Sequence, residues 1–592
     1  MTVQYQGLDC IADKSRQQYM AFKVASQQEI PWASQANYAK YTVYFGVVVI
    51  FLALLKQLYY RFRDYTYRSS LEASATGGTN AVNSLVDVVI SYGRYVGYKP
   101  TSPTLRFYLS FPATWGSTLF MGVSSFYLLC YCFIPHFWYR GCAGFGSPPL
   151  AVRAGMMSTA LMPFIYVLAG KSNMITLLTG ISYEKLNAYH QFVGVAAFVL
   201  SIVHAVPFVY QDLQEGGSSV LHHNFTTDFY YISGIPPLIL LGLLCILSKA
   251  WIRKRLYEFF LHLHWMMGIA LVGTLIWHID YALGAQNYMW GAIAFWGTQI
   301  IYRLLTKTAF RPNAMFLKSR VAHLQKLDEN VYRIDVPEAK DYNWKPGQHC
   351  FLRFKGWRVL DSHPFSISSA SNNGNGMKFI VVPQRGLTGS HYRELDKMVE
   401  INKKVYIDGA YGGTFRDPTK FDKIVLVASG SGVTATLPFL SYLASHGGDN
   451  IKCLNFIWVI RQTQHHNWIR QELDRCQQLL GSKLQIDIRA CHNATYPASA
   501  SASDLEKQVD AKPCGGCSTE LEQKFERPNI TKILYSMASS FSRRNMVICS
   551  GSDSMKREVS NAVSNLQTLV FNNDFRNTNV EEIYLHTESF GW

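Results

Sequence analysis

The sequence predicts a multidomain membrane protein: a transmembrane bundle of seven helices, followed by a water-soluble antiparallel β-barrel and a water-soluble α/β domain. The composition indicates this division. Only 16% of the 592 residues are charged, where about 25% is usual in soluble domains, yet the mean hydropathy of +0.01 is too low for a chain lying wholly in the membrane. Long apolar stretches end near residue 305, and short strand-like and helix-like runs follow Arg311.

Seven stretches approach the length of about 20 residues that a spanning helix needs. They lie at 41–60, 109–135, 153–173, 189–210, 232–248, 259–281 and 287–305. We therefore expect an exoplasmic tail, a transmembrane domain, a barrel, and an α/β domain with a flexible Ala/Ser-rich insertion. The predicted ranges are, in that order, 1–40, 41–305, 312–420 and 421–592, with the insertion at 493–523.

The basic residues predict which side of the membrane each loop faces, because Lys and Arg collect in cytoplasmic loops. If the N-terminus is outside, the outward loops after the first span hold Arg140 and almost no other basic residue. Loop 211–230 has neither Lys nor Arg and carries a glycosylation sequon at Asn224. The soluble half is then cytosolic, and the net charge of +16 reflects topology, which argues against a nucleic-acid partner. The inward-facing residues are Arg61, Arg63, Arg68, Arg94, Lys99, Arg106, Lys185, Lys249, Arg253, Lys254 and Arg255.

Two of the predicted spans carry histidines at the same separation, His190 with His204 and His264 with His278. Fourteen residues turn a helix through about 1400°, about 40° short of four full turns, and rise about 21 Å. Each pair therefore shares one helix face. Because both spans run from inside to outside, the four imidazoles form two facing pairs stacked across the bilayer. Two bis-histidine haems fit that arrangement.

Histidines at membrane depth also have roles that involve no haem. A single such histidine is more often a hydrogen-bonded packing residue, and histidines also serve in proton relays. Neither role requires two helices with one shared spacing, so the pattern favours haem ligation. His262 lies two residues before His264, faces away from it, and is interpreted as structural.

Residues 312–420 predict a small antiparallel barrel, because apolar residues alternate or cluster in short segments separated by turn signals. The barrel contains the segment His363-Pro364-Phe365-Ser366-Ile367-Ser368-Ser369. A strand edge of this kind offers backbone donors and hydroxyls to a flavin ring and its ribityl chain. On its residues alone, the segment is more simply a strand that contains serines.

A strand, a glycine turn and a helix follow at 422–443 and indicate a nucleotide site. Glycines let the backbone approach a phosphate, which the N-terminus of the helix favours electrostatically. Alone, this pattern is weak. Two further strands end on residues of interest, one at Arg461 and one at Cys549-Ser550-Gly551. The residues of the glycine turn and first helical turn are Gly430, Ser431, Gly432 and Thr434.

Together with the paired histidines, these segments resemble the ferric/cupric reductase transmembrane component family, within the superfamily of ferric reductases and NADPH oxidases. The segment 363–369 is similar to the family's flavin signature, 344–348 (Trp-Lys-Pro-Gly-Gln) to the turn before it, and 547–553 to the segment near the nicotinamide. The resemblance implies a ferredoxin-reductase-like module in which the barrel binds FAD and the α/β domain binds NADPH. Family analogy and an ordinary surface residue explain Arg461 equally well.

The sequence departs from the family pattern at three turns. Ser429 stands where a glycine is common, Ala410 and Ser552 stand where proline is usual, and the last of these turns also contains an inserted serine. A terminal aromatic covers the flavin in this family, which implies that role for Phe590 or Trp592. An ordinary packed tail is the alternative.

The resemblance implies an NADPH-dependent metalloreductase that passes electrons through FAD and two haems b to Fe(III) or Cu(II) chelates outside the cell, for metal uptake. It also implies a multi-pass protein of the plasma membrane and functional coupling to metal permeases. No catalytic acid or base is required for the transmembrane step. The cofactors do the redox chemistry and the protein aligns them.

Two other functions stay open at this point. The first is a superoxide-generating NADPH oxidase, and the second is a non-enzymatic membrane transporter or receptor with a degenerate cytosolic half. His136, His222 and His223 could hold a metal outside, although solvated loop histidines are the simpler interpretation. Cys514 and Cys517 have CxxC spacing, but a redox or zinc role needs a context that the sequence does not provide.

Overall fold

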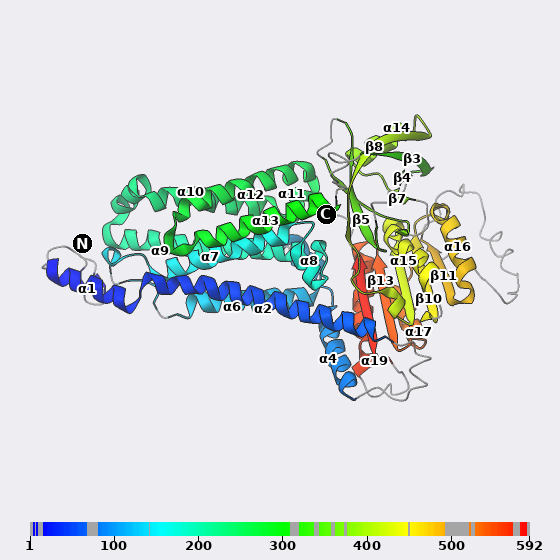
Figure 1. The fold of residues 1–592 in the computed structure, drawn as a ribbon, viewed down its shortest axis with the longest axis horizontal. Helices are drawn as coiled ribbons and strands as arrows, with labels where there is room; N and C mark the ends of the chain where they lie inside the picture. The colour runs from blue at the N-terminus through cyan, green and yellow to red at the C-terminus, as the bar shows by residue number, and fades with distance from the viewer. Residues whose placement is uncertain are drawn as a thin grey trace, which may run out of the picture.

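The computed structural model consists of a helical N-terminal half joined end to end to a half with two β-sheets (Figure 1). This division agrees with the predicted order of a membrane part followed by a soluble part. The residues that the structure describes are 4–5, 8–9, 16–67, 81–109, 111–135, 137–140, 142–307, 319–336, 343–356, 361–371, 376–447, 450–491, 520–522, 527–571 and 580–588.

Within the described residues, six helical stretches are long and apolar enough to cross a membrane. They lie on α2 (Trp32–Tyr65), α6 (Trp115–Phe133), α7 (Pro149–Ala169), α9 (Tyr183–Thr227), α10 (Phe229–Leu247) and α12 (Tyr257–Ile279). The predicted seventh span, 287–305, does form a helix, α13 (Gln286–Lys307), which packs along α7 but is not among the six. The predicted count of seven is therefore supported for six helices.

Helix α7 lies at the centre of the bundle. Ala151, Ala154 and Ala160 on this helix are fully buried, and α7 contacts α2, α9 and α13. Small side chains let neighbouring helices approach closely in a membrane, where packing rather than water exclusion drives association. Helix α7 therefore forms the packing centre around which the other helices of the bundle are arranged.

Short helices lie outside the spans. The region 61–108, expected to be an inward loop, contains α4 (Ala81–Gly97) and α5 (Pro103–Leu109). Helix α8 (Met174–Thr179) connects α7 to α9, and α11 (Ala250–Arg255) connects α10 to α12. The N-terminal region contains the two-stranded pair β1 (Gln4–Tyr5) and β2 (Leu8–Asp9), and then α1 (Arg16–Glu29).

The predicted barrel region forms a six-stranded sheet in which every described pairing is antiparallel, with spatial order β6-β5-β8-β3-β4-β7. Its inward side chains form a continuous apolar core that includes Leu324, Tyr332 and Phe379. Helix α14 (Leu387–Leu395) lies against β3. The strands are β3 (Arg320–Asp328), β4 (Val331–Val336), β5 (Gln348–Phe354), β6 (His363–Ser366), β7 (Met377–Val381) and β8 (Glu400–Gly412).

The C-terminal region is an α/β domain with a parallel sheet of order β12-β11-β10-β9-β13-β14. Its strands are β9 (Lys423–Ser429), β10 (Cys453–Ile460), β11 (Leu484–Ala490), β12 (Glu520–Glu522), β13 (Arg544–Ser550) and β14 (Glu582–Glu588). Helices α15 (Val433–His446) and α16 (Arg470–Leu480) pack in one apolar cluster of the sheet, and α17 (Ile530–Ala538) and α18 (Asp553–Leu566) pack in a second. In such sheets, ligands bind at the carboxyl ends of the strands.

A charged cluster connects the membrane half to the α/β domain. Its centre is Glu582 at the start of β14, whose side chain is fully buried. Arg94 of α4 and Arg416 each place a guanidinium nitrogen 2.8 Å from this carboxylate. We call the group the Glu582 cluster. Its members are Arg63, Asp64, Asp87, Arg94, Arg416, Arg544 and Glu582.

Candidate functional site

The four histidines of the membrane half form two facing pairs, as their spacing predicts. The ring centres of His190 and His264 are 6.2 Å apart, and those of His204 and His278 are 6.1 Å apart. One member of each pair comes from α9 and the other from α12. The pairs are stacked along the helices, with the first pair nearer the soluble half.

Each of these rings is held through its Nδ1 atom. Nδ1 of His190 lies 3.0 Å from the carbonyl oxygen of Ile165, and Nδ1 of His204 lies 2.8 Å from that of Ala151, both on α7. For the two histidines of α12, the partners are serine hydroxyls from α10 and the residue after it. Ser248 Oγ lies 3.2 Å from Nδ1 of His264, and Ser233 Oγ lies 3.1 Å from Nδ1 of His278. Because Nδ1 is occupied in all four rings, Nε2 is the nitrogen that each ring has available for a metal.

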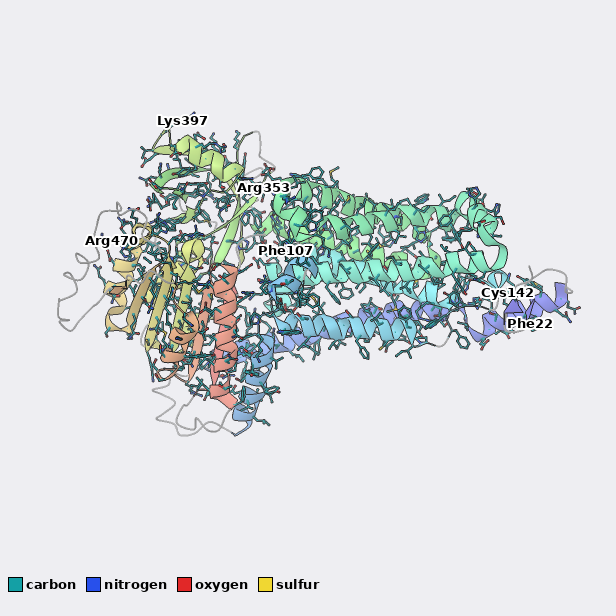
Figure 2. The ribbon with its side chains drawn as sticks, turned by 180° about the vertical axis from the view of Figure 1, so that it is seen from behind. Phe22, Phe107, Cys142, Arg353, Lys397 and Arg470 are labelled. Atoms are coloured by element: carbon teal, nitrogen blue, oxygen red, sulfur yellow. The ribbon has the colours of Figure 1, made fainter. Side chains whose placement is uncertain are left out.

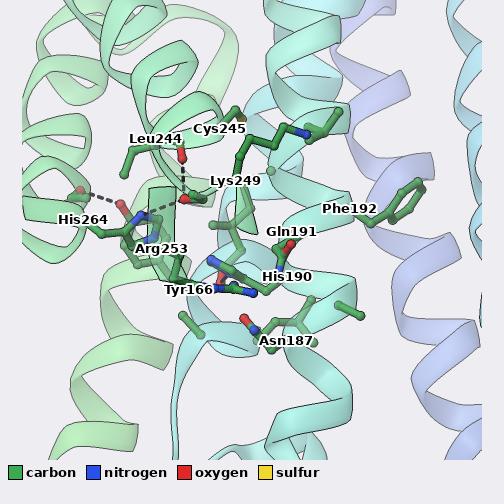
Figure 3. Close-up of a pocket in the computed structure, with 18 of the residues that line it drawn as sticks. Tyr166, Asn187, His190, Gln191, Phe192, Leu244, Cys245, Lys249, Arg253 and His264 are labelled. Carbon is green, nitrogen blue, oxygen red and sulfur yellow. Dashed lines mark hydrogen bonds between the residues drawn. The ribbon is translucent and has the colours of Figure 1, made fainter. Parts of the chain in front are cut away.

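A cavity of about 660 Å³ surrounds the first pair (Figure 3). Both His190 and His264 line it. Three cations, Lys171, Lys249 and Arg253, line it as well. The remaining lining is mostly apolar and aromatic and includes Tyr166 of α7, Trp265 of α12 and Phe351 of β5. The cavity therefore combines metal-binding nitrogens, a large apolar surface and positive charge, and it touches the barrel.

Three contacts link the barrel to the end of the bundle nearest the soluble half. Tyr183 Oη, at the start of α9, lies 2.9 Å from Nε2 of His349 on β5. His363, the first residue of the candidate flavin segment, has its Nε2 atom 3.6 Å from Glu258 Oε1 at the start of α12. In the same region, the ammonium of Lys171 lies 3.1 Å from the centre of the Phe351 ring. Burial lowers the pKa of the His349 imidazole to about 4, so this ring is neutral at pH 7.

The candidate flavin segment occupies β6 and the turn after it. Its Phe365, Ile367 and Ser368 are buried in or beside the barrel core, whereas the other four residues are half-buried. The hydroxyl of Ser368 donates to the carbonyl of Lys378, and that of Ser369 donates to the carbonyl of Gly376. The half-buried residues available to a ligand are His363, Pro364, Ser366 and Ser369.

The glycine turn and the segment after β13 lie side by side. A Cβ atom on Gly432 would lie 2.4 Å from the carbonyl oxygen of Ser550, so only glycine allows this approach. Gly430 has a φ of +53°. Ser429 Oγ accepts a hydrogen bond of 2.9 Å from the backbone N–H of Ser552. Two of the departures from the family pattern thus contact each other and join the two turns.

The other predicted nucleotide residues lie at the same edge of the sheet. Thr434 donates its hydroxyl to the carbonyl of Ser431 and closes the first turn of α15. Arg461 follows β10 directly and is exposed. Cys549 and Ser550 are fully buried at the end of β13, and burial raises the pKa of the Cys549 thiol to about 12. The thiol is therefore a packed, protonated group within the sheet, and Gly551 is the residue of this segment that adjoins Ser429.

Comparison with known proteins decides the family. Three family models match in succession: "Ferric reductase like transmembrane component" over residues 154–275, "FAD-binding domain" over 316–415 and "Ferric reductase NAD binding domain" over 421–564. Ferric/cupric reductase transmembrane component 7 of Saccharomyces cerevisiae is 35% identical over 99% of this chain and 98% of its own length. This chain belongs to the ferric/cupric reductase family. The matched models confirm the predicted cofactor types: FAD, a nicotinamide nucleotide and haem.

More distant similarities were also found. The probable cell surface ferric reductase kap2 of Aspergillus oryzae is 27% identical over 77% of this ferric reductase and 68% of its own length. Among solved structures, the ferredoxin-NADP+ reductase of Plasmodium falciparum is 12% identical, with a TM-score of 0.31, over 48% of this chain and 100% of its own length.

The residues of this ferric reductase fit haem at both histidine pairs. A metal held between two imidazoles lies about 2 Å from each nitrogen, and each ring centre lies about 1 Å further, which places the ring centres about 6 Å apart. The observed 6.2 Å and 6.1 Å agree with this value. The cations of the cavity at the first pair suit the carboxylates that a haem carries.

Glycines give the outer rings their positions. A Cβ atom on Gly155 of α7 would lie 2.5 Å from Nδ1 of His204, and one on Gly234 of α10 would lie 3.1 Å from Cε1 of His278. No motif marks these glycines in the sequence. Their role depends on contacts between helices that only the folded bundle brings together.

Two basic residues of the ferric reductase, half-buried Lys171 and buried Arg153, have no counterpart among the predicted site residues. Lys171 follows α7 and lies between the inner histidine cavity and the barrel. Arg153 of α7 is buried and donates to the carbonyl of Cys132 and to Oε1 of Gln35, each at 2.9 Å. Arg153 is the first residue of a predicted span. Its position, a cation at the edge of an apolar stretch, was the signal in the sequence that could have identified it.

Several predicted features lie outside the described residues. They include His136, the tail aromatics Phe590 and Trp592, and the pair Cys514 and Cys517. His222 and His223 are exposed on the end of α9. In the described part of the chain, three or more His, Cys, Asp or Glu side chains are nowhere grouped so as to hold a metal ion.

Proposed function

We propose that this ferric reductase carries electrons from cytosolic NADPH across the plasma membrane to chelated Fe(III) or Cu(II) outside, for metal uptake. When bound, FAD accepts an electron pair from the nucleotide and haem iron passes single electrons on. The observation that carries the proposal is the stack of two histidine pairs, 6.2 Å and 6.1 Å across. The names of the relatives, ferric/cupric reductases, support the acceptor.

The protein's own contribution is alignment. The His190–His264 pair would hold the inner haem, and the His204–His278 pair, about 21 Å further along the helices, would hold the outer haem. Carbonyls of α7 and two serine hydroxyls fix the ring orientations. The mostly apolar and aromatic walls of the inner cavity would pack against the inner haem. No residue of the membrane half needs to give or take a proton.

We propose seven spans, with α13 as the last. It is 22 residues long and lies along α7 within the bundle (Figure 1). An odd number of crossings places the N-terminus outside when the soluble half is in the cytosol. Cys142 supports this orientation, because it is disulfide-bonded and lies at the end of the bundle away from the soluble half (Figure 2). Disulfides persist in oxidising, extracytosolic compartments.

The domain boundaries and ligand roles are part of the proposal. The tail ends at residue 40, the membrane domain at 305, and the barrel extends from 312 to 420. The barrel binds FAD through 363–369, and the α/β domain binds NADPH through the glycine turn, Arg461 and 549–551. Phe590 covers the flavin ring. A metal permease that is functionally coupled to the reductase would receive the reduced ion.

The test replaces an outer ligand. In His204→Ala, we expect reduction of a membrane-impermeant ferric chelate by whole cells to be abolished, while NADPH still reduces the bound flavin in purified protein. His222→Ala is the matched control, because His222 is exposed further along α9, beyond the kink at Gly217. Retained chelate reduction in His204→Ala, or loss of flavin reduction, would contradict the proposed order. Superoxide outside without reduction of the chelate, in the unsubstituted protein, would make the protein an oxidase.

A further inference from the structure

Helix α4 has its polar face buried and its apolar face exposed. Asp87, Ser91 and Arg94 lie on one side of the helix and are buried. Asp87 pairs with Arg63 of α2. Ser91 donates to the side-chain oxygen of Gln567 at 3.0 Å, and Arg94 donates to Glu582 at 2.8 Å. Polar groups thus fasten this side of α4 to the α/β domain and to α2.

Within the described residues, the opposite side of α4 is apolar and largely exposed, and the ring of Tyr92 also contacts the ring of Phe571 of the α/β domain, with ring centres 5.9 Å apart. Leu85, Val89 and Tyr92 are 66%, 64% and 61% exposed. They recur at intervals of four and three residues, and each lies two residues, or about 200°, from a member of the buried polar stripe. Among the described side chains of α4, the one other exposed position is Gly93. A helix on a water-facing surface has the reverse arrangement, with its apolar stripe against the protein and its polar face in solvent.

The position of α4 explains what its exposed face meets. The backbone N–H of Trp115, the first residue of the spanning helix α6, donates to the carbonyl of Lys99 at 2.9 Å, directly after α4. A Cβ atom on Gly116 would lie 3.0 Å from the Cα atom of Gly97, so the two helix ends touch. The other side of α4 is tied to the end of α2. Helix α4 is therefore fixed at the level where two spans leave the membrane.

The figures show the same placement. Helix α4 crosses the direction of the spanning helices at the end of the bundle, with α19 (Thr568–Phe571) of the α/β domain beside it (Figure 1). Phe107 of the following helix, α5, lies where the bundle meets the soluble half (Figure 2). Its neighbour Tyr108 is 71% exposed. Tyrosine is enriched at membrane–water interfaces, where its ring and hydroxyl suit the headgroup level.

We propose that α4 lies in the plane of the cytosolic membrane surface, with Leu85, Val89 and Tyr92 inserted at the boundary between lipid headgroups and acyl chains. The occupant of the exposed face is lipid of the cytosolic leaflet. Amphipathic helices bind at this depth through one apolar face. The helix then serves as a membrane-seated platform that holds the α/β domain through its polar side, and this role is independent of the metal that the enzyme reduces.

The experiment places a spin label on the apolar stripe in the full chain, purified and reconstituted in lipid nanodiscs. Val89→Cys and Tyr108→Cys provide two separate label sites, and Met398→Cys, 56% exposed on the barrel, is the water-facing control. Signal from the native cysteines is measured on labelled unsubstituted protein and subtracted. Collision of the label with oxygen reports lipid, and collision with a water-soluble nickel chelate reports solvent. NADPH-dependent reduction of a dye shows that each labelled protein is folded.

We expect oxygen to reach the labels at positions 89 and 108 in preference to nickel, and nickel to be preferred at position 398. Nickel access at position 89 equal to that at position 398 would show a water-exposed face and overturn the proposal. Dipolar broadening that appears only in discs holding two copies would show that a second copy of the chain covers α4, and would overturn it too.

Discussion

Replacement of Glu582 by Gln should release the α/β domain from the membrane half. The carboxylate is fully buried and lies within 3.4 Å of guanidinium nitrogens from Arg63, Arg94, Arg416 and Arg544. Burial alone would raise the pKa of this carboxyl, but the neighbouring arginines hold the pKa well below its usual range. In Glu582→Gln the negative charge is lost, and an amide N–H₂ replaces one acceptor oxygen among these cations.

The magnitude follows from the burial. Removing one partner of a buried ion pair costs about 3–5 kcal/mol, because charge is left without compensation. At about 1.4 kcal/mol for each factor of ten, the ratio of docked to undocked domains falls by roughly a hundred- to a few-thousand-fold. Arg63 and Arg94 belong to α2 and α4, so the loss acts on the joint between the two halves.

The assay compares two reactions of one preparation. NADPH-dependent reduction of a soluble dye needs the soluble half, whereas NADPH-dependent reduction of haem needs the joint as well. We expect haem reduction in Glu582→Gln to slow by about tenfold or more, with dye reduction changed by less than about twofold. Glu558→Gln is the matched control, because Glu558 pairs with Arg527 of the same domain at 3.2 Å. Equal haem reduction in the two variants would refute this reasoning.

Three further predictions concern other parts of the molecule. Gly155→Ala should remove the outer haem, because the new Cβ would clash with His204 at 2.5 Å, while Gly273→Ala, with open space beside it, should keep both haem spectra; equal haem content would contradict this. Protonation of His349 should destabilise the soluble half. The pKa of His349 is about 4 in the folded protein and about 6.5 in the unfolded chain. The neutral ring therefore contributes roughly 3 kcal/mol to the free energy of unfolding above pH 6.5, and this contribution declines as the pH falls toward 4. Thermal unfolding followed by flavin fluorescence should show this decline, and His349→Gln should flatten it. Ser429→Ala removes the acceptor that joins the two nucleotide turns, so KM for NADPH should rise about fivefold, for a loss of about 1 kcal/mol, with kcat unchanged; an unchanged KM would show that the bond is dispensable.

The periodic features of the chain were predictable because they depend on helix geometry alone. The 14-residue spacing places His190 with His264 and His204 with His278 whatever the packing details are. The strand patterns likewise predicted the antiparallel sheet that the structure contains, whereas the direction of the strands in the α/β domain was not predicted. The count of spans was less certain, because α13 carries polar residues such as Gln286, Gln299 and Arg303 and is less apolar than the six helices that can span a membrane.

Features that depend on contacts between distant segments were not predictable. Helix α4 was expected to be part of a loop. The burial of its polar stripe depends on contacts with the α/β domain, which the sequence does not show. Ser429 and Ser552 each looked like a defect in a motif, yet they bond to each other. Arg94 was counted as a topological charge, although it also pairs with Glu582, 488 residues further along the chain.

Visible spectroscopy of the solubilised protein without oxygen tests the central claim most directly. NADPH is added first, and a ferric chelate follows. We expect bis-histidine haem bands that develop with NADPH and disappear with the chelate, so that one trace follows electrons from the nucleotide to the metal. A preparation that contains flavin but no haem would contradict this claim, and the four membrane histidines would then be packing residues.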